Sequence, residues 1–323
     1  MTDIKDQENF GLERLDSNCE FVSEPEVLYV TGCGRSGSTI LDTLLGTLDG
    51  VSSFGELRCL PSAVLSEKEY CACGALVSQC PFWSKVLNLV RDQYSDFDLE
   101  RLLWLQRRVE NLGFPPMQRC KEWSEYGRHQ VAVFKALAQI TGSRLLVDSS
   151  KLPSRALALG RTNGVRLRIL HLVRDARGVA WSLSKAYAKN ARSGIQRAIL
   201  GRSTFNSTLL WQWKNLQSTW VTRRVSQTKI LRFRYEDLSE ARSKRVTALS
   251  GFIEVPETEV ASRLEGERML TVGHTVAGNR LRMQRTVKVA VDESWKTDMP
   301  ASDKAWCTLL ASPLLARYGY LAG

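Results

Sequence analysis

The chain has 323 residues, of which 43% are hydrophobic, and it carries a formal net charge of +11. This length fits one large domain, expected at 25–323 after a loosely ordered arm at 1–24. The arm lacks the pattern of a signal peptide, and no apolar run reaches the roughly 18 residues of a membrane span, which favours a cytoplasmic protein. The charge attracts anions, but no basic block with interleaved aromatics indicates nucleic acid.

Short apolar runs alternate with helical patterns along the chain. Strands are predicted at 27–31, 51–57, 144–150, 168–173 and 228–234, and helices at 40–45, 153–161, 175–190 and 240–253. Residues 60–140 are predicted to form a mostly helical insertion. This alternation predicts an α/β, P-loop-like three-layer fold with a central parallel sheet flanked by helices. Ligands of such sheets bind beyond the carboxyl ends of the strands.

The loop after the first predicted strand has the spacing of a phosphate-binding loop. Gly32 and Gly37 are separated by four residues, and Ser38 and Thr39 follow. Glycines let backbone N–H groups approach phosphate oxygens, and a helix N-terminus favours negative charge. A nucleotide triphosphatase would place Lys where Ser38 stands. Arg35 supplies a cation inside the loop instead, which indicates a ligand with fewer phosphate charges and no need of Mg²⁺.

Two segments together resemble the sulfotransferases that use 3′-phosphoadenosine 5′-phosphosulfate (PAPS). Their 5′-phosphosulfate loop is similar to Gly34, Arg35, Ser36, Gly37, Ser38 and Thr39. Their 3′-phosphate motif is similar to Arg174, which follows a predicted strand, and Ser182, eight residues later. The resemblance covers about 27–320. It implies transfer of a sulfuryl group to a hydroxyl or amine of a small-molecule, carbohydrate or peptide acceptor, leaving adenosine 3′,5′-bisphosphate (PAP).

The resemblance also implies roles for residues outside these two motifs. Lys151 stands where related enzymes carry a Lys near the transferred group, and Tyr235 stands where they contact the adenine. The tract 274–282, with Asn279 and Arg282, followed by 292–295, resembles the C-terminal loop that closes over the nucleotide.

The expected chemistry needs fixed cations at the leaving oxygen and a base at the acceptor. Arg35, Lys151 and the loop amides are assigned to the first task, because charge grows on the bridging oxygen as its bond breaks. Glu56 is the candidate base. Together with Arg35 it makes the chain resemble the carbohydrate and tyrosylprotein sulfotransferases more than the cytosolic phenol and steroid enzymes. His274 is the rival base, and His171, inside an apolar strand, is predicted to be a core residue. No metal is needed for this chemistry.

Three cysteines cluster at Cys71, Cys73 and Cys80, and Cys59 could add a fourth. Four thiolates could bind zinc, but the spacing is not two CxxC pairs. A disulfide or a packed turn explains this cluster at least as well as zinc does.

Two other functions stay open at this stage. A P-loop nucleotide kinase or hydrolase would need a Mg²⁺-binding carboxylate at a strand end, for which Asp148 is the candidate. A non-catalytic module could bind sulfated or phosphorylated ligands through its basic surface.

Overall fold

A computed structural model describes residues 24–321 except 111–121, 191–192, 194, 196–197, 199, 226–227 and 266–268. The expected arm at 1–24 lies outside the described residues, apart from its last residue.

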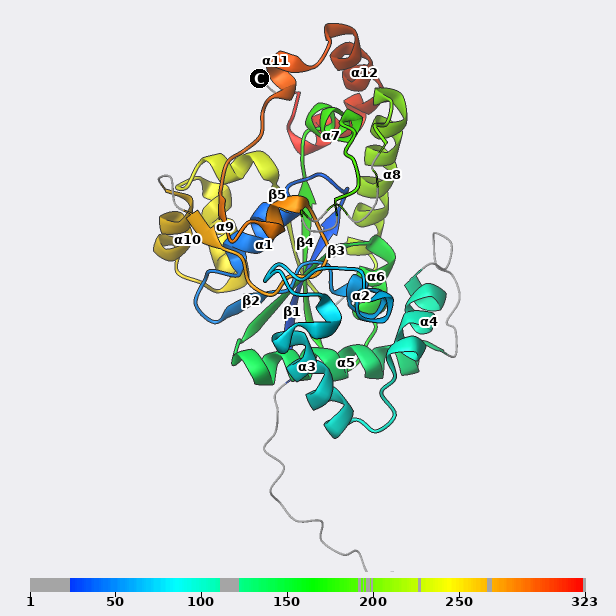
Figure 1. Cartoon of the computed structure of the whole chain (residues 1–323). Helices are drawn as coiled ribbons and strands as arrows, with labels where there is room; N and C mark the ends of the chain where they lie inside the picture. The colour runs from blue at the N-terminus through cyan, green and yellow to red at the C-terminus, as the bar shows by residue number, and fades with distance from the viewer. Residues whose placement is uncertain are drawn as a thin grey trace, which may run out of the picture.

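Five strands form one sheet in the order β2-β3-β1-β4-β5 (Figure 1). They are β1 (Glu26–Gly32), β2 (Val51–Ser53), β3 (Leu145–Lys151), β4 (Arg166–Val173) and β5 (Lys229–Arg234). β1 pairs with β3 on one side and with β4 on the other, and every pairing in this sheet is parallel. All five strands therefore end at the same edge of the sheet, and the predicted parallel sheet is confirmed.

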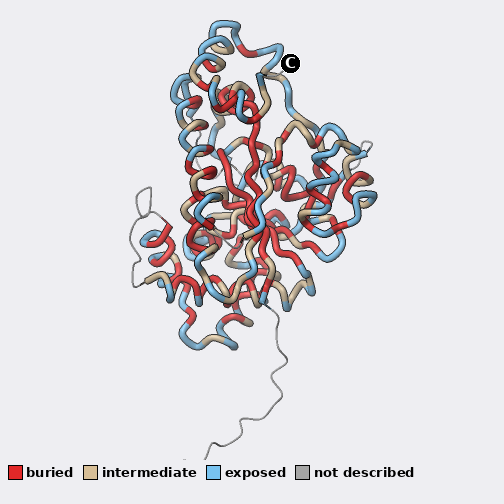
Figure 2. The backbone as a smooth tube through the Cα atoms, turned by 180° about the vertical axis from the view of Figure 1, so that it is seen from behind, coloured by how far each residue is buried: buried red, intermediate tan, exposed pale blue. Residues whose placement is uncertain are grey.

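Helices cover both faces of the sheet. One face carries α1 (Ser38–Leu45), α9 (Lys244–Ile253) and α10 (Glu257–Leu264), and the other carries α5 (Glu122–Thr141), α6 (Pro153–Leu159) and α8 (Thr204–Thr222). Successive side chains of a strand point to opposite faces. Val27 and Tyr29 of β1 accordingly pack in one core cluster, and Leu28 and Val30 pack in another. β1, β3 and most of β4 are buried at the centre of the molecule, where the tube in Figure 2 is red, whereas the edge strand β5 is largely exposed.

The insertion between β2 and β3 is mostly helical, as predicted. It contains α2 (Leu60–Ser66), α3 (Pro81–Gln93), α4 (Leu99–Glu110) and α5. Arg155 of α6 joins it to the sheet, because its guanidinium donates to Asp148 of β3 (2.9 Å) and to Glu110 of α4 (2.6 Å). All three side chains are buried, where a charge is costly unless it is paired and hydrogen-bonded.

Further helices lie beyond the edge where the strands end. These are α7 (Ala176–Ser184), α11 (Trp295–Asp298) and α12 (Ala301–Tyr318), and α7 and α12 pack with α8 around buried Trp211. Between α10 and α11, β6 (Met269–Thr271) and β7 (Thr286–Lys288) form an antiparallel pair.

Three predicted boundaries differ from the observed ones by about four residues or more. β2 ends at Ser53 rather than at 57, because Gly55 takes a left-handed conformation (φ 71°) and pairs with Val276. α7 ends at Ser184 rather than near 190. α9 begins at Lys244 rather than at 240, because the Ser243 side chain caps its first turn.

Among the described residues, no helix is both long and apolar enough to cross a membrane.

His171 is a core residue, as predicted, and it makes the fold sensitive to acid. It is 2% exposed, and its Nε2 lies 2.9 Å from Asn215 Oδ1. Burial lowers its pKa from 6.5 to about 4. The unfolded chain therefore binds the proton first, so stability is fully present above pH 6.5 and is lost as the pH falls toward 4.

We predict that His171→Gln reduces this acid sensitivity. The wild-type free energy of unfolding should fall by about 3 kcal/mol more than that of the variant between pH 7 and pH 4, at 1.36 kcal/mol per pKa unit. Urea unfolding of both proteins at the two pH values measures the difference. Equal pH dependence in the two proteins would contradict the assignment.

Candidate active site

The strand ends meet at a cavity of about 440 Å³. Most of the predicted site residues line it, namely Gly34, Arg35, Gly37, Ser38, Thr39, Glu56, Lys151, Arg174, Ser182, Tyr235 and Asn279. They come from the segments that follow β1, β2, β4 and β5, from the last residue of β3, and from the 274–282 tract. The parallel sheet thus gathers residues that are far apart in the sequence.

The glycine loop and α7 are joined across this cavity. Arg35 has a left-handed backbone (φ 69°), and its Nε donates to Ser182 Oγ at 2.9 Å. Burial lowers the pKa of the Arg35 guanidinium. Gly37 is also left-handed (φ 83°), and a Cβ there would lie 2.1 Å from the Tyr235 ring. A side chain at this position would therefore displace Tyr235.

Arg174 is held in the cavity wall by three groups. It donates to the Arg35 carbonyl (3.2 Å) and to the Asp292 carbonyl (2.5 Å), and its guanidinium lies over the Tyr235 ring at 4.6 Å. Asp175 pairs with Arg177 instead, at 2.6 Å. Arg174 is therefore directed toward the cavity rather than into an ion pair with its neighbour.

Tyr235 links the strand end to the C-terminal segment. Its hydroxyl donates to the Ala290 carbonyl (3.1 Å) and accepts from the Asp292 amide (2.8 Å). Burial raises the pKa of this hydroxyl, which keeps it a neutral donor.

Glu56 and Lys151 lie side by side. Lys151 Nζ donates to Glu56 Oε1 at 2.5 Å, and both side chains are about one-fifth exposed (18% and 23%). The Glu56 amide donates to the Val276 carbonyl (2.8 Å), while Gly55, whose Cβ would lie 2.6 Å from that carbonyl, allows the close approach. A carboxylate and an ammonium are thus held together at the cavity wall.

The side chains of three predicted ligands are enclosed or bonded within the protein, although Asn279 also lines the cavity. Ser36 is 1% exposed, and its Oγ finds no hydrogen-bond partner among the described residues. The Asn279 side chain accepts from the Leu281 amide (3.2 Å). Arg282 lies outside the main cavity lining and donates to the Tyr70 carbonyl at 2.8 Å, so it contacts the loop backbone.

His274 lies among the cysteines rather than in the cavity lining. Its Nδ1 is 3.3 Å from Cys80 Sγ, and its ring stacks on Phe82 with centroids 4.8 Å apart. The two candidate bases are therefore separated in space, and Glu56 alone faces the cavity.

The carboxylate that a kinase would need for Mg²⁺ is already engaged. Asp148 is fully buried, pairs with Arg155, and also accepts from the Ser150 amide at 3.0 Å. It does not face the cavity, which weighs against the kinase alternative.

One lining residue, Lys288, has a role that the sequence patterns did not indicate, whereas Asp292 belongs to the predicted closing loop and gains a defined partner. Lys288 of β7 adds a further cation to the lining, and Asp292 contacts Arg174. Lys288 follows no glycine motif and sits in a strand of three residues, so only its basic character in the C-terminal tract could have drawn attention to it.

A family model described as the sulfotransferase family matches residues 26–259. The chain belongs to the sulfotransferase family. The matched range includes the glycine loop, Glu56, Lys151, Arg174, Ser182 and Tyr235.

Solved structures of sulfotransferases are similar to this family member. A sulfotransferase domain from the curacin biosynthetic pathway is 19% identical over 90% of this chain and 98% of its own, with a TM-score of 0.49. A domain from the Synechococcus PCC 7002 olefin synthase is 18% identical over 93% and 98%, with a TM-score of 0.46. A sulfotransferase from Mycobacterium avium is 13% identical over 92% and 77%, with a TM-score of 0.43. No curated protein sequence matches the chain.

We predict that Tyr235→Phe loosens the segment around Asp292. The substitution removes the two hydrogen bonds of the Tyr235 hydroxyl, to the Ala290 carbonyl and from the Asp292 amide, and a typical hydrogen bond contributes about 0.5–1.5 kcal/mol. Thermal unfolding should show the loss, and hydrogen exchange at the Asp292 amide should become faster. Tyr94→Phe in the insertion is the matched control. An unchanged exchange rate at Asp292 would contradict the anchoring role of Tyr235.

Proposed function

We propose that this protein transfers a sulfuryl group from PAPS to a hydroxyl or amine of an acceptor. One observation carries the proposal: the glycine loop and the Arg174–Ser182 motif face a single cavity and are joined by the Arg35–Ser182 hydrogen bond. A donor with phosphates at both its 5′ and 3′ positions needs two neighbouring anion sites. The family membership supports sulfuryl transfer as the reaction.

The cavity lining suits this donor. Arg174 and Ser182 are assigned to the 3′-phosphate, since Arg grips phosphate with two parallel hydrogen bonds and Ser adds a hydroxyl. The loop amides, Arg35 and the unpartnered Ser36 hydroxyl are assigned to the 5′-phosphosulfate. The Tyr235 ring, packed against Gly37, offers a surface near the nucleoside. With four cations lining the cavity, namely Arg35, Lys151, Arg174 and Lys288, binding is expected without Mg²⁺.

Glu56 and Lys151 are assigned to the two ends of the transfer. As the acceptor oxygen or nitrogen attacks sulfur, its proton passes to the Glu56 carboxylate. The S–O bond to the leaving phosphate breaks, and its electron pair stays on the bridging oxygen. Lys151 and Arg35 stabilise the charge that develops there. The contact between Lys151 and Glu56 orients the carboxylate before the acceptor arrives.

The acceptor is proposed to enter from the side of the helical insertion. Glu56 is followed directly by the short helix Leu57–Cys59 and by α2, so its carboxylate stands at the junction between the sheet and the insertion. Arg35 and Glu56 are the residues in which the chain resembles the carbohydrate and tyrosylprotein sulfotransferases. They therefore favour a carbohydrate or peptide acceptor, or another small molecule with an exposed hydroxyl or amine.

Donor binding is tested by calorimetric titration with PAP in the absence of Mg²⁺. Wild type should bind, and Arg174→Ala should bind about 10- to 150-fold more weakly, because a hydrogen bond to a charged group contributes about 1.5–3 kcal/mol. Arg166→Ala, at the opposite end of β4, is the matched control and should bind like wild type. If PAP does not bind while ATP with Mg²⁺ does, the sulfotransferase assignment is wrong and a kinase is favoured.

The assignment of Glu56 is tested separately, with labelled PAPS and a panel of acceptors. Glu56→Gln should lower turnover by about 10²–10⁴, the usual contribution of a general base, while PAP affinity stays close to that of wild type. Exposed Glu67→Gln is the control. Turnover that survives in Glu56→Gln, with a pH profile like that of wild type, would rule out Glu56 as the base. Binding without turnover on any acceptor in wild type would favour a non-catalytic module.

A further inference from the structure

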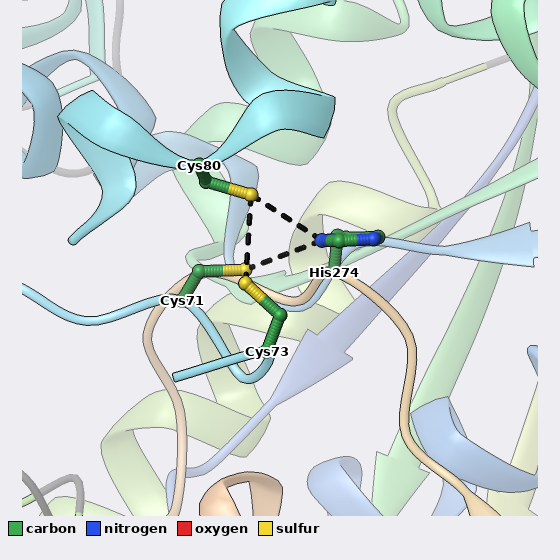
Figure 3. A group of neighbouring side chains, drawn as sticks. All are labelled: Cys71, Cys73, Cys80 and His274. Atoms are coloured by element: carbon green, nitrogen blue, oxygen red, sulfur yellow. Dashed lines mark hydrogen bonds between the residues drawn. The ribbon is translucent and has the colours of Figure 1, made fainter. Parts of the chain in front are cut away.

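Four metal-binding side chains gather outside the cavity, at the contact between the insertion and the C-terminal tract. They are Cys71, Cys73 and Cys80, between α2 and α3, and His274, which follows β6 by three residues (Figure 3). Their Sγ and Nδ1 atoms all lie within 4.8 Å of one another. Cys59, the fourth ligand considered from the sequence, is not part of this group.

The distances between the donor atoms match those around a tetrahedral zinc ion. Zn–S bonds of about 2.3 Å and Zn–N bonds of about 2.0–2.1 Å place two sulfurs about 3.8 Å apart and a sulfur and a nitrogen about 3.6 Å apart. Here Cys73 and Cys80 Sγ are 3.6 Å apart, and His274 Nδ1 lies 3.3 Å from Cys80 Sγ and 3.8 Å from Cys71 Sγ. The sulfurs are free thiols, so the packing does not come from a disulfide.

The surrounding backbone holds the four groups in place. Gly74 (φ 92°) closes a tight turn in which its amide donates to the Cys71 carbonyl at 2.9 Å, and this turn brings Cys71 and Cys73 to the same side. The stacking of His274 on Phe82 fixes the ring with Nδ1 toward the sulfurs.

The composition of the cluster selects the metal. Three thiols and one imidazole are soft and borderline ligands that suit Zn²⁺, and Cys₃His is a recurring set in structural zinc sites. Four protein ligands complete a tetrahedron and leave no position open for a substrate. Three thiolates around Zn²⁺ carry a net charge of −1, and buried Arg282, which donates to the carbonyl of Tyr70 next to Cys71 (2.8 Å), supplies a nearby positive charge.

We propose that Cys71, Cys73, Cys80 and His274 bind a structural Zn²⁺ ion. Binding releases the three thiol protons, forms three Zn–S bonds and one Zn–N bond, and leaves the oxidation state of zinc unchanged. The ion joins the insertion to the segment after β6. The Ala72 amide already donates to the Thr275 carbonyl (3.2 Å). The carbonyl of the next residue, Val276, accepts from the Glu56 amide. The site therefore fixes the backbone that positions Glu56, and it does so independently of the donor.

Metal analysis of the untagged full-length chain, purified without chelator, tests the proposal. Wild type should contain about one zinc per chain, and Cys73→Ser and His274→Ala should lose it. Their affinity for zinc should fall by more than the 10–100-fold that the loss of a surrounding contact typically costs. Cys59→Ser is the matched control and should keep the ion. Cys73 is exposed, so its substitution disturbs packing least.

Two further measurements keep the test valid if a variant fails to fold. Removing zinc from wild type with a chelator should lower the melting temperature, and adding zinc back should restore it. Cobalt(II) in place of zinc should show the thiolate charge-transfer absorption of a tetrahedral site, which Cys73→Ser should abolish. Three results would each overturn the proposal. The first is wild-type protein without zinc, in which mass spectrometry shows a Cys73–Cys80 disulfide. The second is bound zinc whose removal leaves the melting temperature unchanged, and the third is a loss of zinc in Cys59→Ser equal to that in Cys73→Ser. These readouts are independent of sulfuryl transfer, so their failure would leave the proposed function untouched.

Discussion

The parallel pairing of β1 between β3 and β4 is the constraint on which the site depends. The register sets Thr31 beside Lys151 on one side and Gly32 beside Leu172 on the other. The residues that follow these positions therefore leave the sheet at the same edge. Because β1 is apolar and buried on both faces, a shift in register would expose core side chains, so the positions of Arg35, Lys151 and Arg174 follow from the packing of the core.

A single C-terminal segment closes this edge. It contacts the sheet side at Val276, which pairs with Gly55, and the glycine loop at Asn279, whose amide donates to Thr39 Oγ1 (3.2 Å). Farther along, Ala290 and Asp292 bond to Tyr235. The same stretch of chain therefore touches the elements assigned to the acceptor, the sulfuryl group and the nucleotide. A shift of this segment would therefore move residues at all three of these places.

Cationic side chains outnumber carboxylates in the lining of the cavity. Arg35, Lys151, Arg174 and Lys288 line the cavity, and the two carboxylates there, Glu56 and Asp292, each contact one of these cations. Elsewhere in the fold a buried arginine is neutralised within the protein, as Arg155 is by Asp148 and Glu110. The two environments differ in access to ligand. Arg155 joins the insertion to the sheet through buried ion pairs, whereas the cationic side chains of the cavity line a space that a ligand can enter.

The sequence by itself determined the strands, their parallel arrangement and the place of the glycine loop and of Arg174 and Ser182 at the strand ends. These features rest on local patterns, namely apolar runs, glycine spacing and residues placed directly after strands. The parallel sheet then brings the residues that follow its strands close together in space. Only the tertiary structure decided which side chains contact one another at the site. Lys151 contacts Glu56 rather than Asp148, Arg174 contacts Asp292 rather than Asp175, and His274 joins cysteines about 200 residues earlier in the chain. No local pattern specifies such pairings, because they arise only when the insertion and the C-terminal segment pack against the same edge of the sheet.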